Sequence, residues 1–247
     1  MAAPFLLVQL SDPHIGARWA GGDPVASLIA AVDAVRALPQ SPDAVLVSGD
    51  LADNAADAEY ERVRELLAPL AVPIHVLPGN HDDRDAIQRH FGVPGEYAVD
   101  LGPLRLVALD TTVPGEDGGR LDEVRLAWLD EQLAAEPEKS TLVAMHHPPL
   151  ATGIPAQDEI GLPAADRHAL GAIVARHPQV SRLVGGHFHR VIVAELGGRA
   201  VLSVPSTYVQ AGLDFRAGPV ELGPDPAGFV VHALVDGELI SHVQPVV

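Results

Sequence analysis

Five short motifs of carboxylate, amide and imidazole side chains are spread along the sequence, and each could bind a metal ion. One such motif alone is weak evidence, since an aspartate after a glycine, for example, is usually part of a turn. All five follow predicted strands, and together they indicate one site. They supply seven candidate ligands, which are Asp12, His14, Asp50, Asn80, His146, His187 and His189.

The donor types restrict the metals and the chemistry. The sequence has no cysteine, which excludes thiolate ligands and a cysteine nucleophile. Imidazole with carboxylate and amide oxygens suits manganese, iron, zinc or cobalt, and is too rich in nitrogen for calcium or magnesium. Seven ligands divide over two ions if one carboxylate bridges. Two ions about 3.5–4 Å apart can clamp the attacking and leaving oxygens of an in-line displacement at phosphorus, so the residues predict hydrolysis of a phosphoester.

The elements that must position these ligands are short apolar strands that alternate with helical patterns. Strands predicted at 5–10, 44–48, 74–77, 141–145 and 182–184 each end just before a motif. Open α/β sheets bind ligands outside the carboxyl ends of their strands, so we expect the motifs to meet at one edge. Helices are predicted at 24–38, 58–70, 83–91, 121–134 and 164–176, and further strands at 97–101, 104–109, 191–196, 200–204, 229–235 and 238–243.

The domain organisation is predicted to be simple. We find no interdomain linker, repeat or low-complexity segment, and expect residues 1–247 to form one α/β domain. The stretch 205–228 is rich in proline and glycine. Loops of this length are usually functional, so we expect an irregular rim segment near the site. The apolar N-terminus lacks a basic region and is predicted to be a buried strand and not a signal peptide, which favours a cytoplasmic protein.

Charge and hydropathy exclude several partners. The formal net charge is −17, from 33 acidic and 16 basic residues. Such a chain should repel long nucleic acids, whose binding depends on basic residues that neutralise phosphates. A small phosphoester can still bind, because bound cations reverse the local field. The sequence contains no apolar run of the roughly 18–20 residues that a membrane span needs, so no membrane partner is expected.

In these motifs the sequence resembles the calcineurin-like metallophosphoesterases. Their pattern D-x-H, G-D-x-x-D, G-N-H-D, a histidine and G-H-x-H is present in full and in order. Within that superfamily the sequence is most similar to the class III cyclic nucleotide phosphodiesterases and the related glycerophosphodiesterases. The resemblance implies a four-layer α/β/β/α sandwich with mixed sheets. The closer match lies in residues 9–14, 78–82, 119–121, 128–129, 145–149 and 205–210.

The resemblance also implies a role for each ligand. One metal would be held by Asp12, His14, Asp50 and His189, with Asp50 as the bridge, and Asn80, His146 and His187 would complete the second site. The metals would be two divalent or trivalent transition-metal ions, namely manganese, iron or zinc. A homodimer is also compatible with the resemblance.

Two further residues match catalytic positions of the family. His81 matches the histidine that stabilises the transition state or protonates the leaving oxygen, and Asp53 matches the position that orients it. A carboxylate that pairs with a histidine selects its tautomer and raises its pKa. Purple acid phosphatases carry a tyrosine ligand where Asp53 stands, and the protein phosphatases follow that aspartate with arginine where Asn54 stands. These two departures disfavour both subclasses.

The predicted activity is that of a metal-dependent phosphodiesterase acting on a small diester. The substrate would be a 3′,5′-cyclic nucleotide or a glycerophosphodiester, attacked in line by a metal-bound hydroxide. The alternatives are a phosphomonoesterase or nucleotide pyrophosphatase of the same fold, or a non-catalytic scaffold, which the complete ligand set disfavours. His147 and Thr207 are candidate substrate contacts. The first could equally face away from the site, and the second could lie in a plain loop.

Overall fold

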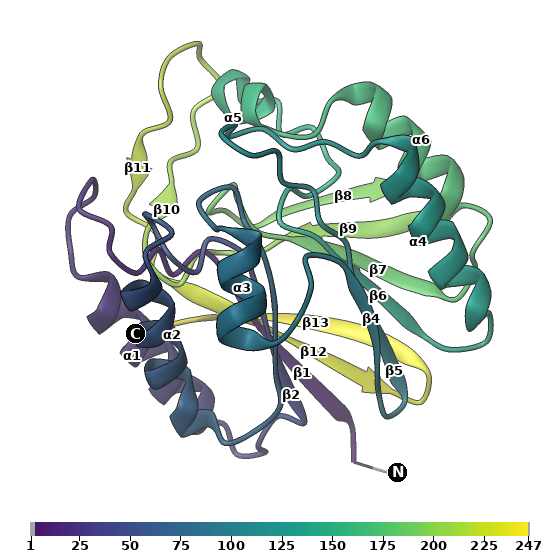
Figure 1. The fold of residues 1–247 in the computed structure, drawn as a ribbon, viewed down its shortest axis with the longest axis horizontal. Coiled ribbons are helices and arrows are strands. Elements are labelled where there is room, and N and C mark those ends of the chain that lie inside the picture. The colour runs from purple at the N-terminus through teal and green to yellow at the C-terminus, as the bar shows by residue number, and fades with distance from the viewer. Residues whose placement is uncertain (1–2, 247) are drawn as a thin grey trace.

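Two β-sheets lie face to face between two layers of helices in the computed structural model, which describes residues 3–246 (Figure 1). In the first sheet, β1, β2 and β3 are parallel, and the C-terminal hairpin of β12 and β13 extends it antiparallel to β1. Its strands, in spatial order, are β13 (Glu238–Pro245), β12 (Gly228–Val235), β1 (Phe5–Leu10), β2 (Ala44–Ser48) and β3 (Ile74–Leu77).

The second sheet is parallel in its centre and antiparallel at both edges. Its central strands β5, β6 and β7 are buried on both faces and consist mostly of leucine, valine and alanine, as expected for parallel strands covered on both sides. In spatial order the strands are β4 (Tyr97–Leu101), β5 (Leu104–Ala108), β6 (Thr141–Ala144), β7 (Val180–Gly185), β9 (Arg199–Ser203) and β8 (Ile192–Leu196).

Three apolar cores hold the layers together. The first packs α1, α2 and α3 on the first sheet, the second joins the two sheets, and the third packs α4 and α6 on the second sheet. The predicted four-layer α/β/β/α sandwich is therefore confirmed. The helical segments are α1 (Pro24–Arg36), α2 (Asp57–Leu67), η1 (Ala68–Leu70), α3 (Arg84–Phe91), α4 (Glu123–Ala135), α5 (Pro155–Ile160) and α6 (Ala164–Val174).

Local signals explain where several helices begin. Asp23 accepts a hydrogen bond from the Val25 backbone N–H at 2.9 Å, and Pro24 occupies the first helical position of α1. Asp83 caps α3 by accepting from the Ala86 backbone N–H at 2.7 Å. Both aspartates satisfy an N–H group that has no partner within its helix. Among residues 3–246, no helix is long and apolar enough to cross a membrane.

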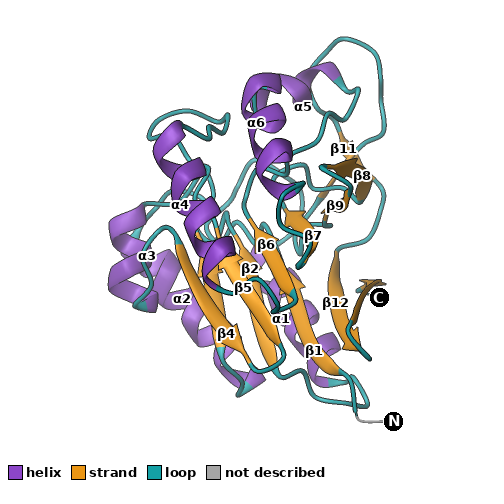
Figure 2. Cartoon of the chain, turned by 90° about the vertical axis from the view of Figure 1, so that its right-hand side faces the viewer, coloured by secondary structure: helices purple, strands orange, loops and turns teal. Residues whose placement is uncertain are grey.

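The elements missed by the sequence prediction are short. α5 has six residues, too few to show a helical repeat of apolar positions, and it had no predicted element. The segment 205–228 contains the two-residue strands β10 (Gln210–Ala211) and β11 (Leu222–Gly223), which pair with each other. Figure 2 shows α5 and β11 in the upper part of the molecule, with β11 near β8 in this view. The predicted rim segment is therefore partly ordered as a small hairpin.

Candidate metal centre

The seven predicted ligands meet where strands of both sheets end. Asp12, His14 and Asp50 follow β1 and β2 of the first sheet, and Asn80 follows β3. The remaining histidines follow the second sheet, after β6 and β7. The centre therefore lies at the carboxyl edge of both sheets, as the strand-end positions of the motifs predict.

The first donor group consists of Asp12, His14, Asp50 and His189, whose ligand atoms all lie within 4.8 Å of one another. The Nε2 atoms of His14 and His189 are 3.1 Å apart. His14 Nε2 is 3.4 Å from Asp50 Oδ2, and His189 Nε2 is 3.6 Å from Asp12 Oδ1. Two imidazole nitrogens and two carboxylates converging in this way suit a transition-metal cation.

The second donor group begins at the same carboxylate. Asp50 Oδ2 is 3.3 Å from His146 Nε2, so this one oxygen lies close to ligand nitrogens of both groups. Asn80 Oδ1 is 3.0 Å from His146 Nε2. His187 clusters with His146 and with His147, within 4.8 Å. Asp50 thus occupies the position of a bridging ligand between two ions.

Hydrogen bonds to the outer nitrogen of each ligand histidine fix its tautomer. His146 Nδ1 lies 2.9 Å from the carbonyl oxygen of Ser48, and His189 Nδ1 lies 3.0 Å from that of Val209. His187 Nε2 lies 3.0 Å from the carbonyl oxygen of Ile160. A carbonyl can only accept, so these nitrogens carry the proton and the other nitrogen is free to bind a metal. This is the usual arrangement around metal-binding histidines, and the donor set therefore fits two ions.

The backbone at the strand ends is unusual. Among residues 3–246, eight residues other than glycine have positive φ, and five of them are predicted ligands. A non-glycine residue in this region is uncommon, costs about 1–3 kcal/mol and persists only where the surroundings hold it. The sharp turns aim consecutive side chains of each motif at the centre. The five residues are Asp12 (φ 52°), His14 (φ 45°), Asp50 (φ 51°), His187 (φ 65°) and His189 (φ 46°).

Glycines next to the ligands allow the loops to approach each other. A Cβ atom on Gly49 would collide with the His146 ring, and one on Gly186 would collide with Ser11 and Asp12. Gly49 also has a φ of 96°, which side chains rarely tolerate. These positions explain why glycine precedes a ligand in both motifs.

Burial and charge shift the pKa values of three predicted ligands, Asp12, Asp50 and His187, toward their metal-binding forms. Burial alone would raise the pKa of Asp50, but His146 and His14 hold that pKa well below its ordinary value. Burial likewise opposes the effect of His189 and His146 on Asp12, whose pKa is also lowered. Burial, with His147 and His146 nearby, lowers the pKa of His187 well below its ordinary value. Ionised carboxylates and a neutral imidazole are what a cation requires.

His81 lies beside the two donor groups. Its backbone N–H donates to Asp50 Oδ1 at 3.0 Å, and its ring centre is 4.8 Å from that of His14. Its side chain is 35% exposed, so the ring can reach a bound substrate. Burial lowers its pKa, but the carboxylate of Asp50 and the carbonyl of Asp53 raise it, and the net effect is an increase.

Asp53 orients His81 differently from the predicted carboxylate–histidine pair. The backbone carbonyl of Asp53 accepts from His81 Nδ1 at 2.9 Å, whereas the nearer carboxylate oxygen is 3.7 Å away. That oxygen instead accepts from His14 Nδ1 at 3.0 Å and from Trp19 Nε1 at 2.9 Å. The carboxylate therefore supports a metal ligand, and the main chain supports His81.

The two candidate substrate contacts are both buried. His147 Nδ1 is 2.8 Å from Thr111 Oγ1, and its Nε2 is 3.0 Å from the Asp117 carbonyl oxygen. Thr207 hydrogen-bonds to the carbonyl of Ser11 through its backbone N–H at 2.9 Å and its hydroxyl at 3.2 Å. These contacts favour supporting roles, in which His147 packs against His146 and Thr207 attaches the rim segment to the first motif.

Two further residues support the site, Asp82, whose sequence position was equally compatible with a helix cap, and Trp19, which was not predicted. Asp82 is partly buried and accepts from the backbone N–H groups of Leu51, Ala52 and Gly79 at 2.9–3.1 Å, which joins the second and third motifs. Its place directly after the G-N-H motif is compatible with a role beside the ligands. The alternative, a helix cap, belongs to the next residue, since Asp83 caps α3. Trp19 lies in the loop after β1, and nothing in its sequence neighbourhood indicated its contact with Asp53.

Comparisons with known proteins agree with this geometry. A family model described as calcineurin-like phosphoesterase matches residues 5–191. The chain belongs to the calcineurin-like phosphoesterase family. The family predicted from the motifs is thereby confirmed, and the donor groups of this phosphoesterase fit its binuclear centre of divalent metal ions.

Curated relatives of this phosphoesterase cover most of its length. A 3′,5′-cyclic adenosine monophosphate phosphodiesterase of Pseudomonas aeruginosa is 37% identical over 84% of this chain and 78% of its own. A probable glycerophosphodiester phosphodiesterase of Arcobacter nitrofigilis is 33% identical over 85% of this chain and 81% of its own. The structure of a dimetal phosphatase from Danio rerio covers 100% of both chains at a TM-score of 0.68 with 16% identity, a similarity of fold.

Proposed function

We propose that this phosphoesterase hydrolyses small phosphodiesters, with 3′,5′-cyclic nucleotides and glycerophosphodiesters as the candidate substrate classes. One observation carries the proposal, namely the position of Asp50 between two groups of metal-binding donors with His81 beside it. Relatives named for these two activities match most of the chain. The predicted homodimer and the predicted cytoplasmic location are tested by none of these observations and stay predictions.

We assign the predicted ligand sets to the two ions. Asp12, His14, Asp50 and His189 would hold one ion, and Asp50, Asn80, His146 and His187 the other. The ions would be manganese, iron or zinc, to which imidazole and carboxylate donors are suited. When bound, they supply positive charge for the phosphoryl oxygens and lower the pKa of a water that serves as nucleophile.

The protein itself positions the substrate and handles one proton. His81 has a raised pKa and an exposed edge, so it can hold a proton near the leaving oxygen and donate it as the ester bond breaks. The Asp53 carbonyl accepts from His81 Nδ1, which leaves Nε2 as the nitrogen that faces the substrate. The Asp53 carboxylate orients His14 toward the metal in the same way.

A side-by-side substrate comparison tests this proposal. Purified protein is stripped of metal, reloaded with manganese, and assayed on bis(p-nitrophenyl) phosphate, p-nitrophenyl phosphate, cyclic AMP and a glycerophosphodiester. We expect diesters to be cleaved with higher kcat/KM than the monoester. A preference for p-nitrophenyl phosphate would favour a phosphomonoesterase and contradict the proposal.

A further inference from the structure

A small apolar hollow adjoins the metal centre and is used by none of the roles assigned above. It has a volume of about 190 Å³, and two predicted ligands, His187 and His189, form part of its lining. Its remaining walls are largely apolar, from Trp19, Ile160 and Leu222 among others. A group held there would be directly next to a phosphate bound at the ligands. The volume is below the roughly 300–1,000 Å³ of pockets for drug-sized ligands, so it suits a single ring system.

Trp19 offers this hollow a flat, open surface. Its indole is 51% exposed although it lies close to the ligands, with its ring centre 5.4 Å from that of His14. The hydrogen bond to Asp53 and an edge contact with Tyr208, at 5.9 Å between ring centres, hold the indole in place. A fixed and exposed indole is a good stacking partner for an aromatic ring.

Gln157 of α5 belongs to the wall of the same hollow. The residue is 1% exposed, and its Nε2 donates to the Phe188 carbonyl at 3.0 Å. That carbonyl can only accept, so the amide orientation is determined. Gln157 Oε1 is then left buried with no hydrogen-bond partner among residues 3–246. A buried acceptor without a partner is costly and is usually satisfied by a ligand or water.

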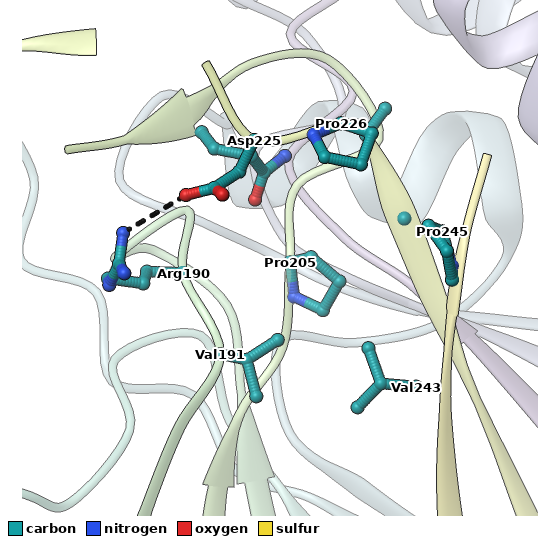
Figure 3. A pocket seen from close by; sticks show the side chains of 10 residues that line it. Arg190, Val191, Pro205, Asp225, Pro226, Val243 and Pro245 are labelled. Atoms are coloured by element: carbon teal, nitrogen blue, oxygen red, sulfur yellow. Dashed lines mark hydrogen bonds and ion pairs between the residues drawn. The ribbon is translucent and has the colours of Figure 1, made fainter. Parts of the chain in front are cut away.

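The surroundings of the centre are asymmetric. A second hollow, of about 280 Å³, borders Asn80 and is lined mainly by polar groups such as Asp83, Arg84 and Thr112. A third lies beside Pro205 and Val243, contains none of the predicted ligands, and has the Arg190–Asp225 ion pair at its side (Figure 3). The hollow at Trp19 and Gln157 thus combines an apolar lining, contact with the predicted ligands, and a wall residue whose buried Oε1 has no partner among residues 3–246.

We propose that this hollow binds a flat, nitrogen-containing ring carried by the diester, and that the Gln157 carboxamide shifts on binding so that its Oε1 accepts from a ring or amino N–H. A nucleobase has this chemistry, whereas glycerol has neither a flat face nor an apolar body to bury. The inference rests on the proposed phosphodiesterase function and selects the nucleotide class of substrate. Trp19, Gln157 and Leu222 then determine specificity, and His81 and the ligands carry out the reaction.

The kinetic test compares variants across three diesters. The substrates are cyclic AMP, the cyclic phosphate of purine riboside, which lacks the amino group, and a glycerophosphodiester. We expect Gln157→Leu to lower kcat/KM for cyclic AMP roughly tenfold, the effect of one lost hydrogen bond, and to change the amino-free analogue little. Leu222→Ala should raise KM for both nucleotides and leave the glycerophosphodiester unchanged. Val243→Ala is the matched control, since Val243 is 45% and Leu222 49% exposed.

A binding measurement tests the hollow without turnover. The chain has two tryptophans, so Trp128→Phe leaves Trp19 as the sole indole reporter. We expect cyclic AMP to quench its fluorescence in metal-free protein, with weaker quenching in the Gln157→Leu background. Equal quenching by glycerol phosphate would overturn the proposal.

The two proposals fail in different ways. If bis(p-nitrophenyl) phosphate and all three diesters stay intact with reloaded metal, the proposed function is wrong. If the diesters are cleaved but Gln157→Leu and Leu222→Ala act equally on ring-bearing and ring-free substrates, the function stands and the ring pocket is wrong. Selective loss of cyclic AMP cleavage would support both.

Discussion

His81 and Asp53 show how single atoms divide the work around one centre. The Asp53 carbonyl accepts from His81, and its carboxylate accepts from His14 and Trp19. One residue thus contacts the proposed proton donor, a predicted metal ligand and the wall of the proposed ring pocket. Replacing His81 and replacing Asp53 should therefore have separable effects.

His81→Ala should keep both metals and lose most turnover. The side chain is absent from both proposed ligand sets, and general acid catalysis contributes roughly 10²–10⁴-fold. The loss should be greatest for diesters with poor leaving groups and smallest for p-nitrophenyl esters, whose leaving oxygen needs no proton. Metal analysis and kcat on both substrate types measure this, and full activity on cyclic AMP would remove His81 from the mechanism.

Asp53→Ala should weaken metal binding. The His14 Nδ1 proton loses its acceptor, and loss of such a partner typically costs 10–100-fold in metal affinity. Asp53→Asn keeps an acceptor oxygen and should lose less. Titration of metal-free protein with manganese compares the two variants. Unchanged affinity in Asp53→Ala would show that the carboxylate does not support His14.

At the scale of elements, tight turns after the strands bring the ligand loops together. Five predicted ligands have positive φ, and glycines leave room where one loop crosses another. Gly186 follows β7 and faces Ser11 and Asp12 of the loop after β1. The contact joins the second sheet to the first at the centre itself.

Gly186→Ala should displace Asp12 and weaken the first metal site. Overpacking of this kind usually costs about 1–3 kcal/mol of stability. Gly21→Ala is the control, because a Cβ atom there meets nothing within 4 Å. Thermal melting and manganese titration should separate the two variants. A Gly186→Ala protein that binds metal normally would show that the loops tolerate the added methyl group.

At the scale of the whole molecule, the metal centre connects the two sheets. Asp12, Asp50 and Asn80 come from loops of the first sheet. The histidines that follow β6 and β7 come from the second sheet. Metal binding should therefore stabilise the packing of one sheet on the other. Binding at 100 times Kd adds about 2.7 kcal/mol per site. We expect EDTA to lower Tm and manganese to restore it, and an unchanged Tm would contradict this coupling.

A chain of buried polar side chains runs across three neighbouring strands of the first sheet, β12, β1 and β2. His232 Nε2 is 2.9 Å from Gln9 Oε1, and Gln9 donates to Ser48 Oγ at 2.8 Å. Burial, with Arg182 nearby, lowers the pKa of His232 to about 3. This histidine is neutral in the folded protein and protonates in the unfolded chain below its ordinary pKa of 6.5.

Stability should therefore fall on acidification between pH 6.5 and about 3. In that range the unfolded chain binds more protons at His232, so the free energy of unfolding rises with pH, by up to about 1.4 kcal/mol per unit. His232→Gln should flatten part of this slope, because glutamine does not titrate. Urea unfolding at several pH values measures both proteins, and identical slopes would contradict the assignment.

Much of this architecture follows from the sequence because its signals are local. Strands at Phe5–Leu10 and Ile74–Leu77 are observed where their apolar runs predict them. The seven ligands could be chosen because each motif carries a metal-binding donor directly after a strand. α5 and the hairpin of β10 and β11 were missed, since six-residue and two-residue elements contain too little pattern.

Only the tertiary structure determines the contacts between segments that are far apart in the chain. His14 meets His189 across 175 residues, and the hollow joins Trp19 to Gln157 and Leu222. Sequence could name Asp53 and His147, but not that the Asp53 carboxylate turns to His14 or that both His147 nitrogens are occupied. Residue type and local period determine which donors exist and which strand they follow. Packing alone determines which atoms face each other, and therefore the partner of each donor and the shape of the pocket beside them.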